Sequence, residues 1–185
     1  GDDKKGDDKK GDDKKGDDKK GDDELKDVKH NGKGKMTYIQ PNTNGYKEYE
    51  GELKDRKPSG KGVMTYTQPN TTRYKEYEGM WKDGKPSGKG VMTYTQPNYI
   101  NHYIKYEGEW KDGKHNGKGV MKYSNDDVYD GEWEDGKRNG QGVMKKPNGD
   151  VYYEGEWKDD KPNGKGVMTY TQPNYINNYK EYEGE

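Results

Sequence analysis

The side chains of this chain that could perform acid–base or nucleophilic chemistry are carboxylates, lysines, hydroxyls and three histidines, and thiol chemistry is excluded because there is no cysteine. Glu107 and Glu109 lie two residues apart, and paired carboxylates can act as general acid and general base. The same Glu-x-Glu spacing recurs along the chain, and lysines such as Lys118 and Lys122 are expected beside it. We therefore predict a ladder of ion pairs between neighbouring strands rather than a catalytic pair.

The remaining candidates for chemistry also belong to repeated structure. His30 and His115 occupy equivalent turn positions about three repeat units apart, whereas the ligands of a metal site must converge. Residues 85–90, Lys-Pro-Ser-Gly-Lys-Gly, resemble a phosphate-binding loop, but Gly90 stands where that motif requires Ser or Thr. No Ser, His and Asp arrangement converges either. We expect no catalytic, cofactor-binding or metal site.

A fixed spacing between Tyr and Met recurs throughout the chain. In five units the Tyr that opens a Tyr-x-Gly motif is followed fifteen residues later by Met: Tyr49 and Met64, Tyr77 and Met92, Tyr106 and Met121, Tyr129 and Met144, Tyr153 and Met168. The distance from each Met to the next opening Tyr varies between 8 and 14 residues, so the links have a short and a long form. This pattern indicates a repeat protein whose units stack because each is too small to fold alone.

The composition limits the kind of core and the kind of partner. Only 23% of the 185 residues are hydrophobic and 38% are charged, but there are 18 Tyr, 4 Trp and 7 Met. Since large aromatics must supply nearly all the burial, we expect a thin, single-layered structure. The net charge of −1 argues against nucleic acid as a partner. With no signal peptide or membrane-spanning stretch, we expect an intracellular, cytoplasmic protein with cytoskeletal or membrane association.

The chain divides into four segments. Residues 1–20 are four copies of Gly-Asp-Asp-Lys-Lys, which predict a disordered tail, with an ionic interaction arm as the alternative. Residues 21–48 hold a degenerate first repeat, and residues 49–181 hold five full repeats. Residues 182–185 begin a further repeat, so we expect a fragment of a longer protein whose open sheet edge pairs with its continuation or with a second copy.

Each unit has the pattern of a β-hairpin. In residues 106–111 the apolar positions alternate with charges, and residues 117–123 form the returning strand, with Gly117, Gly119 and Met121 predicted on the ring-bearing face. Asp112-Gly113 predicts a two-residue turn, although a loop of three to five residues fits the following Lys-His-Asn as well. Glycine on the ring-bearing face leaves space for a Tyr or Trp ring.

These positions resemble the MORN (membrane occupation and recognition nexus) repeat, whose units run roughly Y-x-G-x-W-x-x-G-x-x-x-G-x-G. The match is carried by Tyr77, Gly79 and Trp81, Tyr106, Gly108 and Trp110, Tyr129, Gly131 and Trp133, and Tyr153, Gly155 and Trp157. At Tyr49 the Trp is replaced by Leu53 and the turn glycine by Arg56, and Asp160 replaces the turn glycine of the last unit. The resemblance implies an all-β fold, an elongated single-layer antiparallel sheet of stacked hairpins.

Two of the long links carry apolar residues that could bind a partner: Tyr99, Ile100, Tyr103 and Ile104 in one, Tyr175, Ile176 and Tyr179 in the other. The alternative is that these residues pack on each other. The resemblance implies a non-catalytic scaffold for protein partners in a cytoskeletal, ciliary or membrane-associated assembly. Two further possibilities are a targeting segment of a larger enzyme, such as a phosphatidylinositol phosphate kinase, and a phospholipid-binding module, for which Lys145 and Lys146 could act locally.

Overall fold

The computed structural model describes residues 25–26, 30–68, 73–95, 102–172 and 175–183, and its side chains are described from residue 30 to residue 169. The predicted disordered tail, residues 1–20, and the link residues Tyr99 and Ile100 lie outside the described residues. The predicted start of a further repeat lies within them only as far as Glu183.

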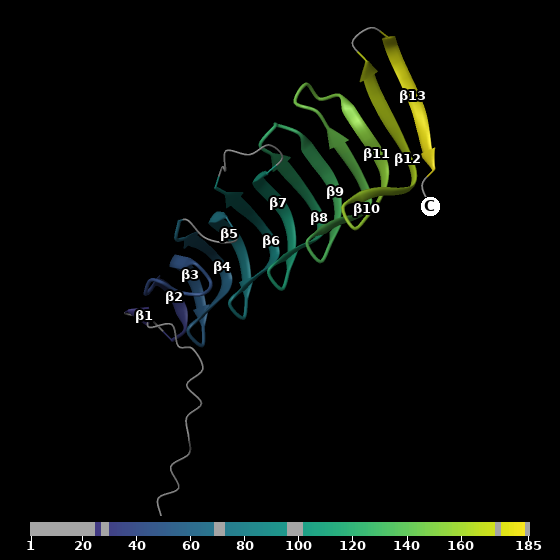
Figure 1. The fold of residues 1–185 in the computed structure, drawn as a ribbon. Coiled ribbons are helices and arrows are strands. Elements are labelled where there is room, and N and C mark those ends of the chain that lie inside the picture. The colour runs from purple at the N-terminus through teal and green to yellow at the C-terminus, as the bar shows by residue number, and fades with distance from the viewer. Residues whose placement is uncertain (1–24, 27–29, 69–72, 96–101, 173–174, 184–185) are drawn as a thin grey trace, which may run out of the picture.

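The described chain is all β, and its strands form one open antiparallel sheet in which the spatial order follows the chain order. The sheet is an elongated, twisted ribbon (Figure 1). Its strands are β1 (Leu25–Lys26), β2 (Gly32–Tyr38), β3 (Tyr46–Lys54), β4 (Lys57–Tyr66), β5 (Tyr74–Lys82), β6 (Lys85–Tyr94), β7 (Tyr103–Lys111), β8 (Lys114–Tyr123), β9 (Val128–Glu134), β10 (Lys137–Lys145), β11 (Val151–Lys158), β12 (Lys161–Gln172) and β13 (Tyr175–Glu183). This confirms the predicted fold class.

The turn of each hairpin is the tightest that two antiparallel strands allow. Lys111 pairs with Lys114, which leaves Asp112 and Gly113 as the only two turn residues. Their φ angles are 51° and 82°, as a type I′ turn requires at both central positions. The two-residue turn predicted from Asp-Gly is therefore confirmed, and the longer loop is wrong.

A bulge near the turn breaks the alternation of side chains in the returning strand. In the β7–β8 pair, Gly108 pairs with Gly119 and Trp110 pairs with His115, so the returning strand carries the extra residues. Gly117 lies in this bulge with φ +67°, and a Cβ built there would come 2.7 Å from a carboxylate oxygen of Glu109. The prediction that Gly117 shares the ring-bearing face is wrong, because strict alternation ends at the bulge.

The core lies on one face of the sheet. The opening Tyr of every unit is fully buried, as are most of the Met residues fifteen positions later: Tyr49, Tyr77, Tyr106, Tyr129, Tyr153, Met64, Met92 and Met121 are all 0% exposed. Each opening ring lies over the paired glycines of its own hairpin, and a Cβ on Gly119 would come 2.2 Å from the hydroxyl of Tyr106. The glycines therefore provide space for the rings, as predicted.

The opposite face is charged, but its ion pairs differ from the prediction. Glu107 pairs with Lys105 two residues earlier in the same strand, and Lys122 pairs with Asp126. The register places Val120 opposite Glu107 and Glu132 opposite Lys118. Glu107 therefore does not pair with Lys118 or Lys122, since the bulge shifts the register that simple alternation would give. Lys35 of β2, however, does pair with Glu48 of the neighbouring β3, at 2.9 Å.

Candidate functional site: an aromatic trough

The ring-bearing face carries a continuous column of Tyr and Trp side chains. Each Trp lies edge-to-face between the Tyr of its own unit and the Tyr of the preceding unit; the centroid of Trp110 is 5.1 Å from Tyr106 and 5.2 Å from Tyr77. Its indole Nε1 donates to the backbone oxygen of Gly90, at 3.3 Å. The Trp ring and its indole N–H therefore both contact the preceding unit, and they join the two units in addition to the strand pairing between them.

A second column consists of Tyr side chains alone. Its rings contact one another edge-to-face at 5.2–5.7 Å, in the order Tyr38, Tyr46, Tyr66, Tyr74, Tyr94, Tyr103 and Tyr123. The rings of the returning strands are buried, whereas Tyr46, Tyr74 and Tyr103 are only half-buried. Asp126 and Asp150 take the corresponding place in the next two units. The column thus presents one half-exposed ring per unit over the first three full units.

The hairpin turns form a rim on one side of these columns and the long links form a rim on the other, and backbone hydrogen bonds stabilise both rims. On one side, the turn of each hairpin donates to the preceding unit, as from Gly113 N to the oxygen of Pro86 at 3.0 Å. On the other side the long links are tied to one another, as from Thr95 N to the oxygen of Arg73 at 2.8 Å. The two rims turn the aromatic face into a trough.

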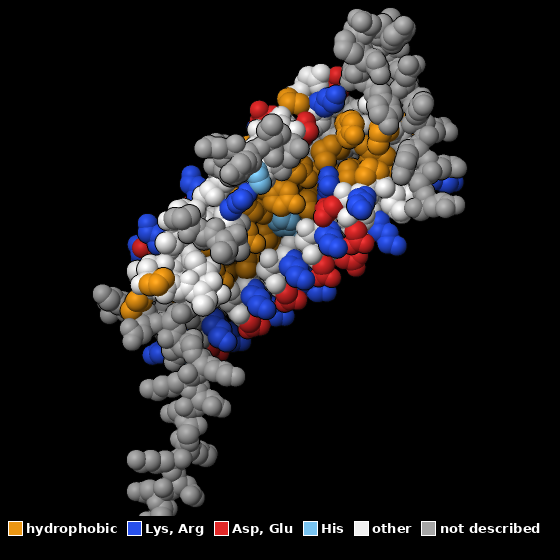
Figure 2. All heavy atoms as spheres, viewed as in Figure 1, with side chains coloured by type: hydrophobic (Ala, Val, Ile, Leu, Met, Phe, Trp, Pro, Cys, Tyr) orange, Lys and Arg blue, Asp and Glu red, His pale blue; other side chains and the backbone are white. Residues whose placement is uncertain are grey.

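The trough has a groove of about 710 Å³ at its first units. Tyr46, Tyr66 and Tyr74 line it together with Pro86, the link at residues 40–45, and the turn residues Asp112 and Gly113. Apolar side chains gather along the trough and charged side chains of both signs border it (Figure 2). Clefts that hold ligands are usually about 300–1,000 Å³, so the groove is large enough to take one.

One position of the trough differs from unit to unit. It lies nine residues after the opening Tyr and holds Pro58, Pro86, His115, Arg138 and Pro162 in turn. His115 is buried in β8, its ring stacked on that of Tyr106 with centroids 3.8 Å apart. Burial raises the pKa of the Tyr94 hydroxyl well above its usual range and lowers the pKa of His115 to about 3. The hydroxyl therefore donates to a neutral Nε2, at 2.9 Å.

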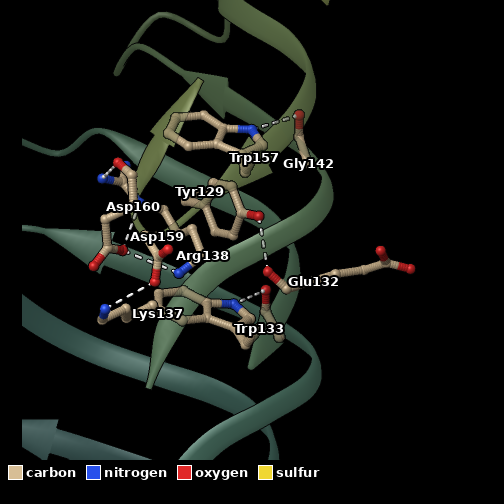
Figure 3. A network of polar contacts seen from close by, with 10 residues as sticks. Tyr129, Glu132, Trp133, Lys137, Arg138, Gly142, Trp157, Asp159 and Asp160 are labelled. Atoms are coloured by element: carbon tan, nitrogen blue, oxygen red, sulfur yellow. Dashed lines mark hydrogen bonds and ion pairs between the residues drawn. The ribbon is translucent and has the colours of Figure 1, made fainter. Parts of the chain in front are cut away.

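Arg138 makes a different set of contacts at the same position (Figure 3). Its guanidinium lies 4.4 Å from the ring centroid of Trp157, in cation–π contact. It also donates from Nε to a carboxylate oxygen of Asp160 at 3.2 Å and from Nη2 to the backbone oxygen of Asp160 at 2.7 Å. Asp160 is the residue that replaces the turn glycine, so this departure from the pattern supplies a partner for Arg138.

The predicted binding residues that the structure describes fall in two strands. Tyr103 and Ile104 lie in β7, where Tyr103 packs in the second column instead of standing free at the tip of a link. Tyr175, Ile176 and Tyr179 lie in β13, of which only the backbone is described. Tyr46 and Tyr74 were missed as candidates, although a Tyr three residues before the opening Tyr was a visible signal in each long-linked unit.

Neither a cluster of metal ligands nor a membrane-spanning helix is found among the described residues. They contain no group of three or more His, Cys, Asp or Glu placed to hold a metal ion. The described part of the chain also has no helix with the length and hydrophobicity that crossing a membrane would require.

Comparison with known families identifies the repeats. The family model described as MORN repeat matches residues 49–68, 77–96, 106–128, 129–151 and 153–172, together more than half of the chain. None of the curated proteins matches this chain. Each matched segment opens at the Tyr of the first aromatic column and spans one hairpin. By its repeats and by the sheet that they build, the chain belongs to the MORN repeat family.

Proposed function

We propose that this chain is a non-catalytic scaffold that binds protein partners through its aromatic trough, in a cytoplasmic assembly associated with the cytoskeleton, a cilium or a membrane. MORN repeats form an interaction module, and the all-β repeat is typically non-catalytic. The single observation that carries the proposal is the groove between the two rims, which offers half-exposed Tyr rings as contact surface. Aromatic side chains are enriched where protein surfaces bind each other.

The trough is a better candidate than the opposite face. The opposite face carries many Lys and Glu side chains, and its apolar side chains, such as Met80, Val120 and Val167 at 42%, 38% and 39% exposure, stand singly among them. Charged residues are depleted at the centres of protein interfaces, and exposed ion pairs contribute little. A partner would therefore gain more by burying the Tyr rings than by covering the charged face.

The experiment is a capture from eukaryotic cell extract with the full chain immobilised. One variant carries Thr67→Arg and Gln40→Arg, which place two large side chains at the trough, and a matched variant carries Thr65→Arg and Val63→Arg on the opposite face. We expect proteins that are captured by the parent and by the second variant, but not by the first. Equal capture by both variants would contradict the trough as the site. Circular dichroism of each variant serves as the folding control.

The predicted apolar link residues need their own variant. Tyr99→Ser with Ile100→Ser tests them while leaving Tyr103 in the second column, where its ring contacts Tyr94 at 5.6 Å. Partners lost with this variant and retained with the trough variant would assign binding to the link.

Phospholipid binding is the second candidate, and the charge of the turns favours it. Residues 54–57, 82–85 and 111–114 hold seven Lys or Arg and three Asp, a net charge of +4 on one rim. Acidic lipid surfaces attract such clusters. Sedimentation with vesicles of acidic and of neutral phospholipid tests this candidate, and binding that is absent from both kinds of vesicle would eliminate it.

A further inference from the structure

The half-exposed tyrosines of the trough recur with a regular spacing along its axis. Tyr46, Tyr74 and Tyr103 are the first residues of β3, β5 and β7, so one strand lies between each of them and the next, and they are two strand spacings apart. Neighbouring strands lie about 4.7–4.9 Å apart, so the rings repeat every ~9.5 Å along the stack. A ligand that runs along the trough meets an equivalent ring at each such step.

One backbone conformation matches this spacing. A polyproline II helix has three residues per turn and rises about 3.1 Å per residue, so it repeats the same face every ~9.3 Å. An α-helix rises about 1.5 Å per residue and returns to the same face after seven residues, or ~10.5 Å. This repeat is longer than the ~9.5 Å spacing of the rings, so a helix would fall out of register with them over three units. An extended strand alternates its faces, so its residues i and i+3 point in opposite directions.

The side chains of the groove suit the same ligand. Tyr rings and Pro86 line it, and aromatic grooves recognise proline-rich segments because the polyproline II conformation is already formed and has little entropy to lose. The rim beside these three units carries the net charge of +4, whereas the turns of the last two full units, residues 134–137 and 158–161, carry −1. Acidic side chains facing this rim would complement its charge.

We propose that the trough over the units opening at Tyr49, Tyr77 and Tyr106 binds a partner segment in the polyproline II conformation, with proline at every third position and acidic residues beside the prolines. The prolines sit between successive half-exposed Tyr rings. The acidic residues face the turns, which carry Lys57 and Lys85. This inference rests on the proposed function and specifies the chemistry of the partner at the same site.

The test uses a dye-labelled peptide of four Pro-Glu-Gln units and the full chain, with binding followed by fluorescence anisotropy. One control peptide replaces every Glu by Lys. A second control has the same composition, but its prolines alternate between two-residue and four-residue spacing. We expect the first peptide to bind at least about tenfold more tightly than either control. Equal binding of the irregularly spaced peptide would overturn the match of spacing, and no binding of any peptide would overturn the proposal.

Protein variants locate the contact. Lys57→Glu with Lys85→Glu reverses exposed charges on the rim of the three units and should weaken binding about tenfold. Lys161→Glu with Lys165→Glu makes the same change of charge in the last full unit and should leave binding unchanged. In amide NMR spectra, Gly45 and Gly113, which line the groove, should shift on addition of peptide. Shifts confined to the opposite face would overturn the proposal.

Failure of this inference can be told apart from failure of the proposed function. If the peptides do not bind but the trough variant still loses its captured proteins, the trough binds partners of another conformation. If acidic vesicles bind instead and Lys57→Glu with Lys85→Glu abolishes their binding, the rim serves lipid headgroups and the peptide proposal is wrong.

Discussion

The imidazole of His115 stacks on the ring of Tyr106, with centroids 3.8 Å apart and planes inclined by 17°. Trp110 and Trp133 contact the imidazole edge-to-face at 4.7 and 5.0 Å, and its Nδ1 is buried without a hydrogen-bond partner among the described residues. A protonated imidazole would be poorly solvated there. Proline occupies the equivalent place in three other full units, so this one unit has gained a titratable group in its core.

Acid should therefore destabilise the protein through His115. Burial lowers its pKa from 6.5 to about 3 in the folded state, so between these values the unfolded chain binds more protons than the folded chain. The stability that comes from keeping His115 neutral is fully present above pH 6.5. As the pH falls from 6.5 towards 3, the free energy of unfolding decreases by about 1.4 kcal/mol per pH unit. Chemical denaturation at a series of pH values measures this slope.

His115→Pro provides the matched control for the pH prediction, because Pro58 and Pro86 fill the same position in other units. The variant should fold and show a shallower dependence of unfolding free energy on pH below 6.5. Identical pH profiles for the parent and the variant would show that His115 is not protonated on unfolding in this range.

The indole column should dominate stability. Trp110→Ala removes a buried ring between Tyr77 and Tyr106 and the donor to Gly90, and should cost about 3–5 kcal/mol. Trp110→Leu should cost less, since Leu53 stands at this position in the first full unit and is 4% exposed. Thermal unfolding followed by circular dichroism compares the two, and an unchanged transition for Trp110→Ala would refute the role of the column.

Arg56→Gly should stabilise the first full hairpin. Arg56 has φ +60°, a conformation that costs a residue with a Cβ roughly 1–2 kcal/mol and costs glycine far less. Glycine loses more conformational entropy on folding than arginine does, and this cost offsets part of the gain. The free energy of unfolding should therefore rise by about 0.5–1 kcal/mol. Asp160→Gly at the equivalent position gains the same relief, since Asp160 has φ +68°. It should nevertheless destabilise, because the carboxylate that accepts hydrogen bonds from N and Nε of Arg138 is lost, and bonds to a charged group are worth about 1.5–3 kcal/mol. If denaturant midpoints move in the same direction for both variants, this explanation is wrong.

Met80→Glu should also stabilise. Elsewhere the residue at this position is Glu, whose carboxylate lies at the bulge; Glu132 accepts a hydrogen bond from Gln141 N at 2.9 Å. Met80 leaves the bulge at Gly88 without that acceptor and is 42% exposed. The gain should be about 1 kcal/mol in unfolding free energy, and Glu132→Met should cost a similar amount. The unfolding free energy should rise for Met80→Glu and fall for Glu132→Met. A fall for Met80→Glu would contradict this explanation.

The sequence pattern was sufficient to predict the hairpins, the Asp-Gly turns and the placing of rings over glycine, because a period of two and a turn signal are local properties. The bulge at Gly117 was not predicted, because a period of two assumes equal numbers of residues on both strands, whereas the returning strand carries extra residues between His115 and Gly119. The burial of His115 and the trough itself depend on contacts between units. Spacing along one unit does not contain that information, although the extra Tyr46 and Tyr74 in long-linked units were a signal for it.

The most direct test of the account is photo-crosslinking from two lysines of strand β6 in cell extract. Lys85 lines the trough and Lys89 lies on the opposite face, and both are exposed. Each is replaced in turn by benzoylphenylalanine in the full chain. If the trough binds protein partners, crosslinked species will form from position 85 and not from position 89. Crosslinks from position 89 alone, or equally from both positions, would contradict the account.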